Sequence, residues 1–329
     1  YALSAGLPPI YGLYAALTPQ IVYAFLGTSR QLAIGPVAMD SLLVAAGLGA
    51  LSIVSPDQYI QMAILLALLM GLIQFLLGLF RMGFIVAFLS KPVISGFTSA
   101  AAIIIGLSQL KHLLGISIPQ SNKLHVIIGS FFNSNTPVHF PTLAIGLVGI
   151  ALMLIIKKWL RKIPASLFIL VLGMTWVYFT QQNEKGVAIV GLIPEGLPFF
   201  SKPNLNWANV QVLFSTALTL ALIAFMEAIS VAKAIEEKHK NYEVNPNQEL
   251  IALGASNIIG SLFQSYPTTG GFSRTAVNDQ AGAKTGVSPL ITAAIIAIVL
   301  SFFTHWFYYL PKAILAAIII VAVVNLINI

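Results

Sequence analysis

The sequence contains no cysteine, which excludes disulfide bonds as well as thiol and iron–sulfur chemistry. Charged residues are also scarce, at 8% of the 329 residues, whereas they make up about a quarter of a soluble domain. No basic patch is interleaved with exposed aromatic residues, so nucleic acid is not an expected partner. The sequence also lacks a nucleotide-binding loop, a nucleophile–base pair and metal-ligand spacing of its histidines. We therefore expect neither an enzyme nor a bound metal or cofactor.

Hydrophobic residues dominate instead, at 58% of the chain, with a mean hydropathy of +0.91. Apolar runs long enough to cross about 30 Å of hydrocarbon recur along the whole length, which predicts an all-α polytopic protein embedded in the lipid bilayer. A helix tail is expected at about 1–7, and a bend within the long fifth span at Lys91-Pro92. The remaining spans are expected at about 10–27, 58–80, 83–115, 141–160, 165–181, 209–235, 248–263, 287–308 and 311–329.

Two stretches interrupt this apolar pattern, GPVAMD at residues 35–40 and GGFSRTAV at residues 270–277. Each predicts a half-helix that begins in mid-membrane after a short extended segment, at about 36–50 and at about 273–283. We expect Gly35 and Ser273 to be the N-caps and Pro36 to take the first helical position. The N–H groups of Val37, Ala38 and Met39 would then be free. Two facing helix N-termini would form an anion site at the bilayer midplane.

A kink in a continuous membrane helix is the alternative interpretation of the first break. The second break favours paired half-helices, because it follows the same pattern and has Arg274 beside it. Placing the Lys- and Arg-rich ends on the cytoplasmic side sends the two half-helices in opposite vertical directions. This arrangement is expected of an inverted-repeat transporter. Small residues elsewhere are expected to allow close helix packing, namely Gly71, Gly78, Gly254 and Gly260.

Ionisable residues inside the membrane are costly and mark functional sites. Arg274 lies in the first turn of the second half-helix, where the dipole disfavours a cation, so it is expected to face an anion or to form a salt bridge with Asp40 or Glu227. Glu227, in mid-span, is expected to be a proton-coupling site, a counter-ion to Arg274 or a structural acid. Asp40 is expected either to have a capping or structural role, or to be part of the anion site. Thr269 either lines the cavity or bonds to backbone.

Several motifs resemble those of the sulfate permease (SulP) family of anion transporters. They are YALSAGLPPIYGLY at 1–14, GTSR at 27–30, AIGPVA at 33–38, NQELIALG at 247–254, GSLF at 260–263 and SRTAVN at 273–278. They follow the family's order along the whole chain. The resemblance implies the uracil-permease fold of seven plus seven inverted repeats, of which residues 1–329 would form about twelve helices. Residues 1–163 would give most of the first repeat and residues 164–329 most of the second. The chain is then expected to be part of a longer protein, without the last two helices and the cytoplasmic STAS domain.

The resemblance also implies a site. It places the anion between the two half-helices, within reach of Tyr1, Val37, Ala38, Phe272, Ser273 and Arg274, and it gives cation coupling to Glu227. It further implies a homodimer, an elevator-like movement of a core against a gate domain, and a multi-pass place in the cell membrane, expected to be a bacterial inner membrane.

The expected function is therefore secondary active transport of sulfate or a related inorganic or carboxylate anion, by symport with H⁺. The alternatives are a Na⁺-coupled bicarbonate symporter or an anion exchanger of the same fold. Outside carriers, an anion channel would need no coupling acid, so Glu227 argues against it. A non-transporting motor or sensor is a further alternative, which uptake into liposomes would exclude.

Overall fold

The computed structural model describes residues 1–51, 53, 55–84, 99, 103, 106–107, 109–116, 129, 137–159 and 165–324. The expected bend at Lys91-Pro92 and the expected boundary between residues 163 and 164 lie outside the described residues, as does most of the span at about 83–115. The side chain of Ser273 also lies outside them.

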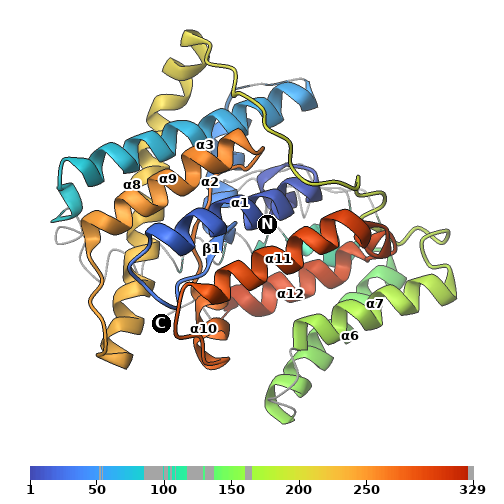
Figure 1. Cartoon of the computed structure of the whole chain (residues 1–329). Helices are drawn as coiled ribbons and strands as arrows, with labels where there is room; N and C mark the ends of the chain where they lie inside the picture. The colour runs from blue at the N-terminus through green and yellow to red at the C-terminus, as the bar shows by residue number, and fades with distance from the viewer. Residues whose placement is uncertain are drawn as a thin grey trace. The chain divides into compact units, whose positions relative to one another are not determined.

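The regular secondary structure in the described part of the chain is almost entirely helical (Figure 1). The helices are η1 (Leu3–Ala5), α1 (Pro9–Leu26), α2 (Ala38–Gly49), α3 (Pro56–Leu79), α6 (Phe140–Trp159), α7 (Ala165–Thr180), α8 (Trp207–His239), α9 (Pro246–Leu262), α10 (Phe272–Gln280), α11 (Val287–Phe302), η3 (Thr304–Phe307) and α12 (Lys312–Val324). Two short strands, β1 (Ile34–Gly35) and β2 (Thr269–Gly270), complete it. The all-α expectation is confirmed, but the expected helix tail at about 1–7 is only the three-residue 3₁₀ turn η1.

The chain divides into two compact units, each built from two separate stretches of sequence. Unit 1 comprises Tyr1–Ser90 and Glu195–Phe302, and unit 2 comprises Lys91–Pro194 and Phe303–Ile329. Both short strands and both half-helices, α2 and α10, belong to unit 1. The candidate site therefore lies in one unit.

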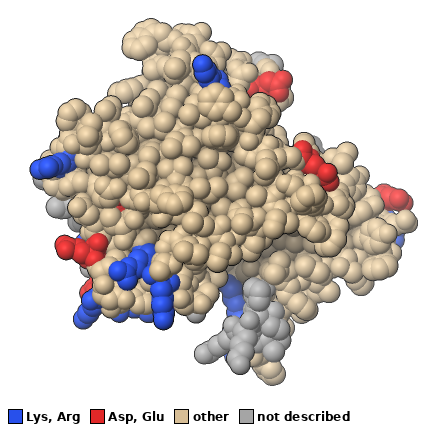
Figure 2. Space-filling model, viewed as in Figure 1, with Lys and Arg blue, Asp and Glu red and all other residues tan. Residues whose placement is uncertain are grey.

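Among the described helices, α3, α6 and α8 are long and apolar enough to cross a membrane, and α2, α7, α11 and part of α12 are shorter apolar helices. Helix α7 shows why such helices suit lipid, because Phe168, Leu172, Trp176 and Phe179 recur at helical spacing and are all exposed. Figure 2 shows that charged side chains are also sparse on the visible face, where most of the surface is neither acidic nor basic. An exposed apolar surface of this extent is stable in a bilayer and not in water.

Backbone-to-backbone packing between α3 and α9 forms the rigid centre of unit 1. A Cβ atom on Gly254 would lie 2.4 Å from the backbone nitrogen of Phe75, and one on Gly71 would lie 2.8 Å from the carbonyl oxygen of Gly254. Gly78 similarly meets the backbone of Ile251. The prediction that these glycines serve helix packing is confirmed.

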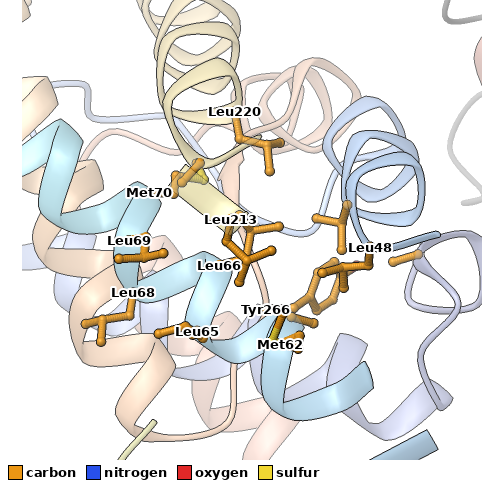
Figure 3. Close-up of a cluster of buried hydrophobic side chains, with 14 of the residues drawn as sticks. Leu48, Met62, Leu65, Leu66, Leu68, Leu69, Met70, Leu213, Leu220 and Tyr266 are labelled. Atoms are coloured by element: carbon orange, nitrogen blue, oxygen red, sulfur yellow. The ribbon is translucent and has the colours of Figure 1, made fainter. Parts of the chain in front are cut away.

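A cluster of buried apolar side chains fills unit 1 between α2, α3 and α8 (Figure 3). Leu66, Met70, Leu213 and Leu220 come together there, and Tyr266, fully buried, extends the cluster to α2. Because lipid tails are as apolar as these side chains, the cluster stabilises the fold by close van der Waals packing. The cluster packs the first half-helix against α3 and α8.

Candidate functional site

Two short strands hold the two half-helices together. Strands β1 and β2 pair antiparallel, with Ile34 opposite Gly270 and Gly35 opposite Thr269. The backbone N–H of Gly271 extends this pairing by donating to the carbonyl of Ala33 at 3.2 Å. Because each strand leads directly into a half-helix, antiparallel pairing sends the helices away from one another, with α2 above and α10 below β1 in Figure 1.

The first half-helix begins later than expected and the second begins earlier, and both N-caps differ from the prediction. Helix α2 begins at Ala38 with Val37 as N-cap, because Gly35 is part of the strand pair and Pro36 follows it as a link. Helix α10 begins at Phe272 with Gly271 as N-cap, so the assignment of Ser273 as N-cap was wrong. Neither helix receives a side-chain cap. The first-turn N–H groups of both helices therefore remain available to a ligand.

The two helix N-termini lie next to one another. A Cβ atom placed on Gly271, the N-cap of α10, would lie 3.4 Å from Cγ2 of Val37, the N-cap of α2. This spacing is ordinary van der Waals contact, so no protein layer separates the two caps. A single small anion can therefore be reached from both N-termini, and both helix dipoles favour a negative charge there.

Arg274 lies against the first strand, between the two breaks. Its guanidinium donates to the carbonyl oxygens of Pro36 at 2.6 Å and Ile34 at 3.3 Å. Gly35 makes room for it, because a Cβ atom there would lie 2.0 Å from Nη1. Among the described residues Arg274 has no ion pair, so the predicted alternative of a structural salt bridge to Asp40 or Glu227 was wrong. Carbonyl partners leave its positive charge uncompensated and available to an anion.

The two acidic candidates are both buried. Asp40, in the first turn of α2, is 0% exposed, and neither of its carboxylate oxygens has a hydrogen-bond partner. Its predicted capping role is therefore wrong. Glu227, in the middle of α8, is 9% exposed, and its Oε2 also lacks a partner. The two carboxyl groups interact electrostatically across the site.

The remaining predicted residues differ in how far they are exposed. Tyr1 and Phe272 are each 37% exposed, and Tyr1 lies within electrostatic range of both Arg274 and Glu227. Thr269 is fully buried in β2, and its hydroxyl donates to the carbonyl of Ala224 on α8 at 2.6 Å. Thr269 thus ties the strand pair to the helix that carries Glu227.

A buried amide network, which the sequence did not single out as such, supports the second break. Asn257 on α9 accepts from the backbone N–H of Thr268 at 2.9 Å and donates to the carbonyl of Thr268 at 3.0 Å and to Gln74 of α3 at 3.3 Å. Gln74 in turn donates to the carbonyl of Ala221 on α8 at 3.1 Å. This network fixes the segment before β2 to three helices and satisfies its backbone groups in a region without water.

Glu249 is a second residue that the sequence analysis missed, and it fixes the loop before β1. Its fully buried carboxylate accepts from the hydroxyl of Tyr23 at 2.8 Å, from the backbone and hydroxyl of Thr28 at 2.7 Å and 2.5 Å, and from the backbone of Ser29 at 3.2 Å. The signal available in the sequence was an acid in the first turn of an otherwise apolar helix.

Tyr242, in the loop after α8, completes this support. Burial raises the pKa of its hydroxyl, which donates to Oε1 of Gln31 at 2.8 Å, and its ring lies 5.1 Å from the Arg30 guanidinium carbon. These contacts hold the segment that leads into β1.

Two discontinuous helices that meet at a short strand pair, together with an arginine that has no ion pair among the described residues and two buried acids, are typical of the broken-helix class of membrane proteins. Within this class, the chain belongs to the Sulfate permease family, which it matches over residues 1–329. The resemblance noted in the sequence is thereby confirmed.

Comparisons with individual relatives agree with this family assignment. The chain is 44% identical to Sulfate transporter 4.1, chloroplastic, of Arabidopsis thaliana, over 100% of this chain and 48% of that protein. Its fold is similar to the murine anion transporter Solute Carrier 26 family member A9, with a TM-score of 0.91 and 28% identity, over 99% of this chain and 57% of that one. It is also similar to the transmembrane domain of the cyanobacterium bicarbonate transporter BicA, with a TM-score of 0.87 and 26% identity, over 99% and 84%. The chain spans about half the length of the curated relatives it matches.

Proposed function

We propose that this chain is the membrane-embedded part of a secondary active transporter for sulfate or a related small anion. The observation that carries the proposal is the contact between the two uncapped N-termini of α2 and α10, with the guanidinium of Arg274 beside them. Two helix N-termini and an unpaired cation provide a strong positive potential with no bulky recognition pocket. Such a site suits an inorganic anion or small carboxylate. The names of the plant relatives favour sulfate.

Coupling to H⁺ through Glu227 is the second part of the proposal. Glu227 lies in mid-span on α8, nearly fully buried, with one carboxylate oxygen unpartnered. A carboxylate in that position is costly unless it binds a cation, and a proton neutralises it most simply. Protonation would also remove a negative charge that opposes entry of the anion. Transport would thus move the anion together with H⁺.

The division into two units supports an elevator-like mechanism. Unit 1 carries all the described candidate residues, so it can move the site as one body, as a core domain would. Unit 2 would then serve as the gate domain. We further propose a homodimer in the cell membrane, expected to be a bacterial inner membrane.

A Na⁺-coupled bicarbonate symporter is the second candidate, and the likeness to BicA favours it. The two candidates share the anion site and differ in the driving ion. An anion exchanger would need neither the H⁺ nor the Na⁺ gradient, and a channel would let the anion move only down its own electrochemical gradient. The driving ion therefore separates the two symporters from each other and from these two functions, and dependence on a counter-anion separates the exchanger from the channel.

The test is uptake of radiolabelled sulfate into proteoliposomes made with the purified protein, with imposed H⁺ or Na⁺ gradients at a clamped membrane potential. Wild type is expected to accumulate sulfate under an inward H⁺ gradient. Arg274→Ala is expected to raise the KM for sulfate about 10- to 100-fold, because a charge-assisted hydrogen bond contributes about 1.5–3 kcal/mol. Glu227→Gln is expected to transport without a response to the gradient.

The matched control for Glu227→Gln is Glu237→Gln, which removes an exposed carboxylate ten residues further along α8. It is expected to behave as wild type. Accumulation driven by Na⁺ alone, or of bicarbonate but not sulfate, would favour the second candidate. An unchanged gradient response in Glu227→Gln would disprove the coupling role, and an unchanged KM in Arg274→Ala would disprove the anion site.

A further inference from the structure

Asp40 occupies a position that ordinary helix chemistry does not explain. A first-turn carboxylate normally accepts N–H bonds at its helix terminus or faces water. The Asp40 carboxyl group does neither, because it is 0% exposed and both oxygens lack partners. Leaving an ionised carboxylate in this state costs several kcal/mol, so it must be neutralised in another way.

Glu227 shares this condition, and the packing of α2 against α8 brings it toward Asp40. Thr216 of α8 lies against Gly47 of α2, where a Cβ atom would meet it at 2.3 Å, and Ala224 of α8 bonds to the strand pair that leads into α2, so the two helices run antiparallel. Asp40 and Glu227 lie two and three turns from the Gly47–Thr216 contact, on the same faces of their helices.

Glu227 is 9% exposed, with Oε2 unpartnered. Arg274 compensates neither acid, because its guanidinium is bound to the carbonyl oxygens of Ile34 and Pro36. No ion pair within the described part of the chain involves Asp40 or Glu227.

We infer that Asp40 and Glu227 form one two-carboxylate proton site, in which ionisation of either acid holds the proton on the other. This inference rests on the proposed function and adds a second coupling residue, on the half-helix that binds the anion. The physical basis is like-charge repulsion, which makes two neighbouring buried carboxyl groups bind protons as a pair. The first half-helix would then carry both an anion-binding N-terminus and part of the proton site.

The other titratable groups around the pair are few among the described residues. Tyr266, from the segment before β2, interacts electrostatically with Asp40 and Arg274, and its hydroxyl is 3.1 Å from Oγ of Ser41. Because the Ser41 hydroxyl donates to the carbonyl of Val37, it accepts from Tyr266. Tyr1 faces Glu227 and Arg274 from the N-terminal segment. Neither tyrosine donates to a carboxylate of the pair, so the proton has only the two acids to bind.

The first experiment compares initial sulfate uptake by wild type, Asp40→Asn, Glu227→Gln and the double variant, between about pH 5 and about pH 8 outside, at fixed internal pH. Wild-type uptake is expected to fall as pH rises. In Asp40→Asn the fall is expected about 1 to 2 pH units lower, because Glu227 no longer has a like charge beside it. Glu227→Gln and the double variant are both expected to lack the gradient response. Asp57→Asn, in the exposed first turn of α3, is the control.

The second experiment uses unmutated protein, so it does not depend on the folding of a variant. A hydrophobic carbodiimide reacts with protonated buried carboxyl groups. Peptide mass spectrometry locates the adduct, and the mass of the intact protein gives the number of adducts per molecule. We expect label at both Asp40 and Glu227, falling together as pH rises, but on only one of the two in any molecule. Asp57 is exposed, outside the apolar interior that the reagent enters, and is expected to stay unlabelled.

An Asp40→Asn variant with the wild-type pH profile, or a wild-type protein labelled at Glu227 and never at Asp40, would overturn the inference. A wild-type protein that shows no proton-driven uptake would instead overturn the proposed coupling. The labelling experiment distinguishes these failures, because it reports whether the two acids share a proton even if no transport is seen.

Discussion

Replacing Gly35 by alanine tests whether the strand pair positions Arg274 for an anion. The new Cβ would lie 2.0 Å from Nη1, 2.8 Å from Cζ and 3.0 Å from Nη2 of Arg274, and none of these distances is tolerable. The guanidinium must therefore move away from the carbonyl oxygens of Ile34 and Pro36. Alanine also strains the backbone, since Gly35 has φ of 157°.

The expected result is a weaker anion site. A hydrogen bond to a charged group contributes about 1.5–3 kcal/mol, and about 1.4 kcal/mol corresponds to a factor of ten. Loss of the Arg274–anion contact should thus raise the KM for sulfate about 10- to 100-fold in the proteoliposome assay. Gly49→Ala is the matched control, because Gly49 lies at the far end of the half-helix that follows β1 and its new Cβ would meet nothing within 4 Å.

A double variant separates the displaced arginine from backbone strain. If the clash is the cause, Gly35→Ala combined with Arg274→Ala should have the KM of Arg274→Ala alone, since the clashing atoms are gone. A further, independent loss in the double variant would attribute the effect to the backbone. Wild-type KM in Gly35→Ala, with raised KM in Arg274→Ala, would refute positioning by this glycine.

Two further predictions concern the scaffold and use thermal unfolding in detergent. Gly254→Ala should destabilise the protein by about 1–3 kcal/mol, because its new Cβ would meet the backbone of Phe75. The control Gly49→Ala should leave the stability unchanged, and equal stability of the two variants would contradict close α3–α9 packing. Glu249→Gln should cost about 1.5–3 kcal/mol, because an amide cannot accept all the hydrogen bonds from Tyr23 and the following loop, and a wild-type unfolding temperature would rule this out.

Hydrophobic pattern was sufficient to predict most of the helices. The span expected at about 58–80 is α3, Pro56–Leu79, and the one expected at about 165–181 is α7, Ala165–Thr180. Such agreement is possible because the length of an apolar run in a membrane is set by the bilayer and not by distant contacts. The half-helices were predicted for the same reason, since polar and glycine-rich residues break the run.

Details of the site could not be predicted, because they depend on contacts between distant parts of the chain. Gly35 looked like an N-cap, but it pairs with Thr269, which only the fold brings beside it. Arg274 was expected to face an anion or to pair with an acid, yet it donates to two carbonyl oxygens exposed by the first break. Glu249 resembled an ordinary first-turn acid, and its partners lie more than 200 residues earlier.

The partners of Arg274 bear directly on how coupling would work. If the arginine were paired with one of the acids, the carboxylate would compensate its charge, and the arginine would oppose protonation of that acid. Because it is bound to neutral carbonyl groups, the site carries one positive charge against as many as two negative ones from Asp40 and Glu227. With both acids ionised, the site repels an anion, and with protons bound it attracts one. On the proposed mechanism, proton binding and anion binding therefore strengthen one another by the same free energy, as linkage requires, with no need for a separate conformational signal between them.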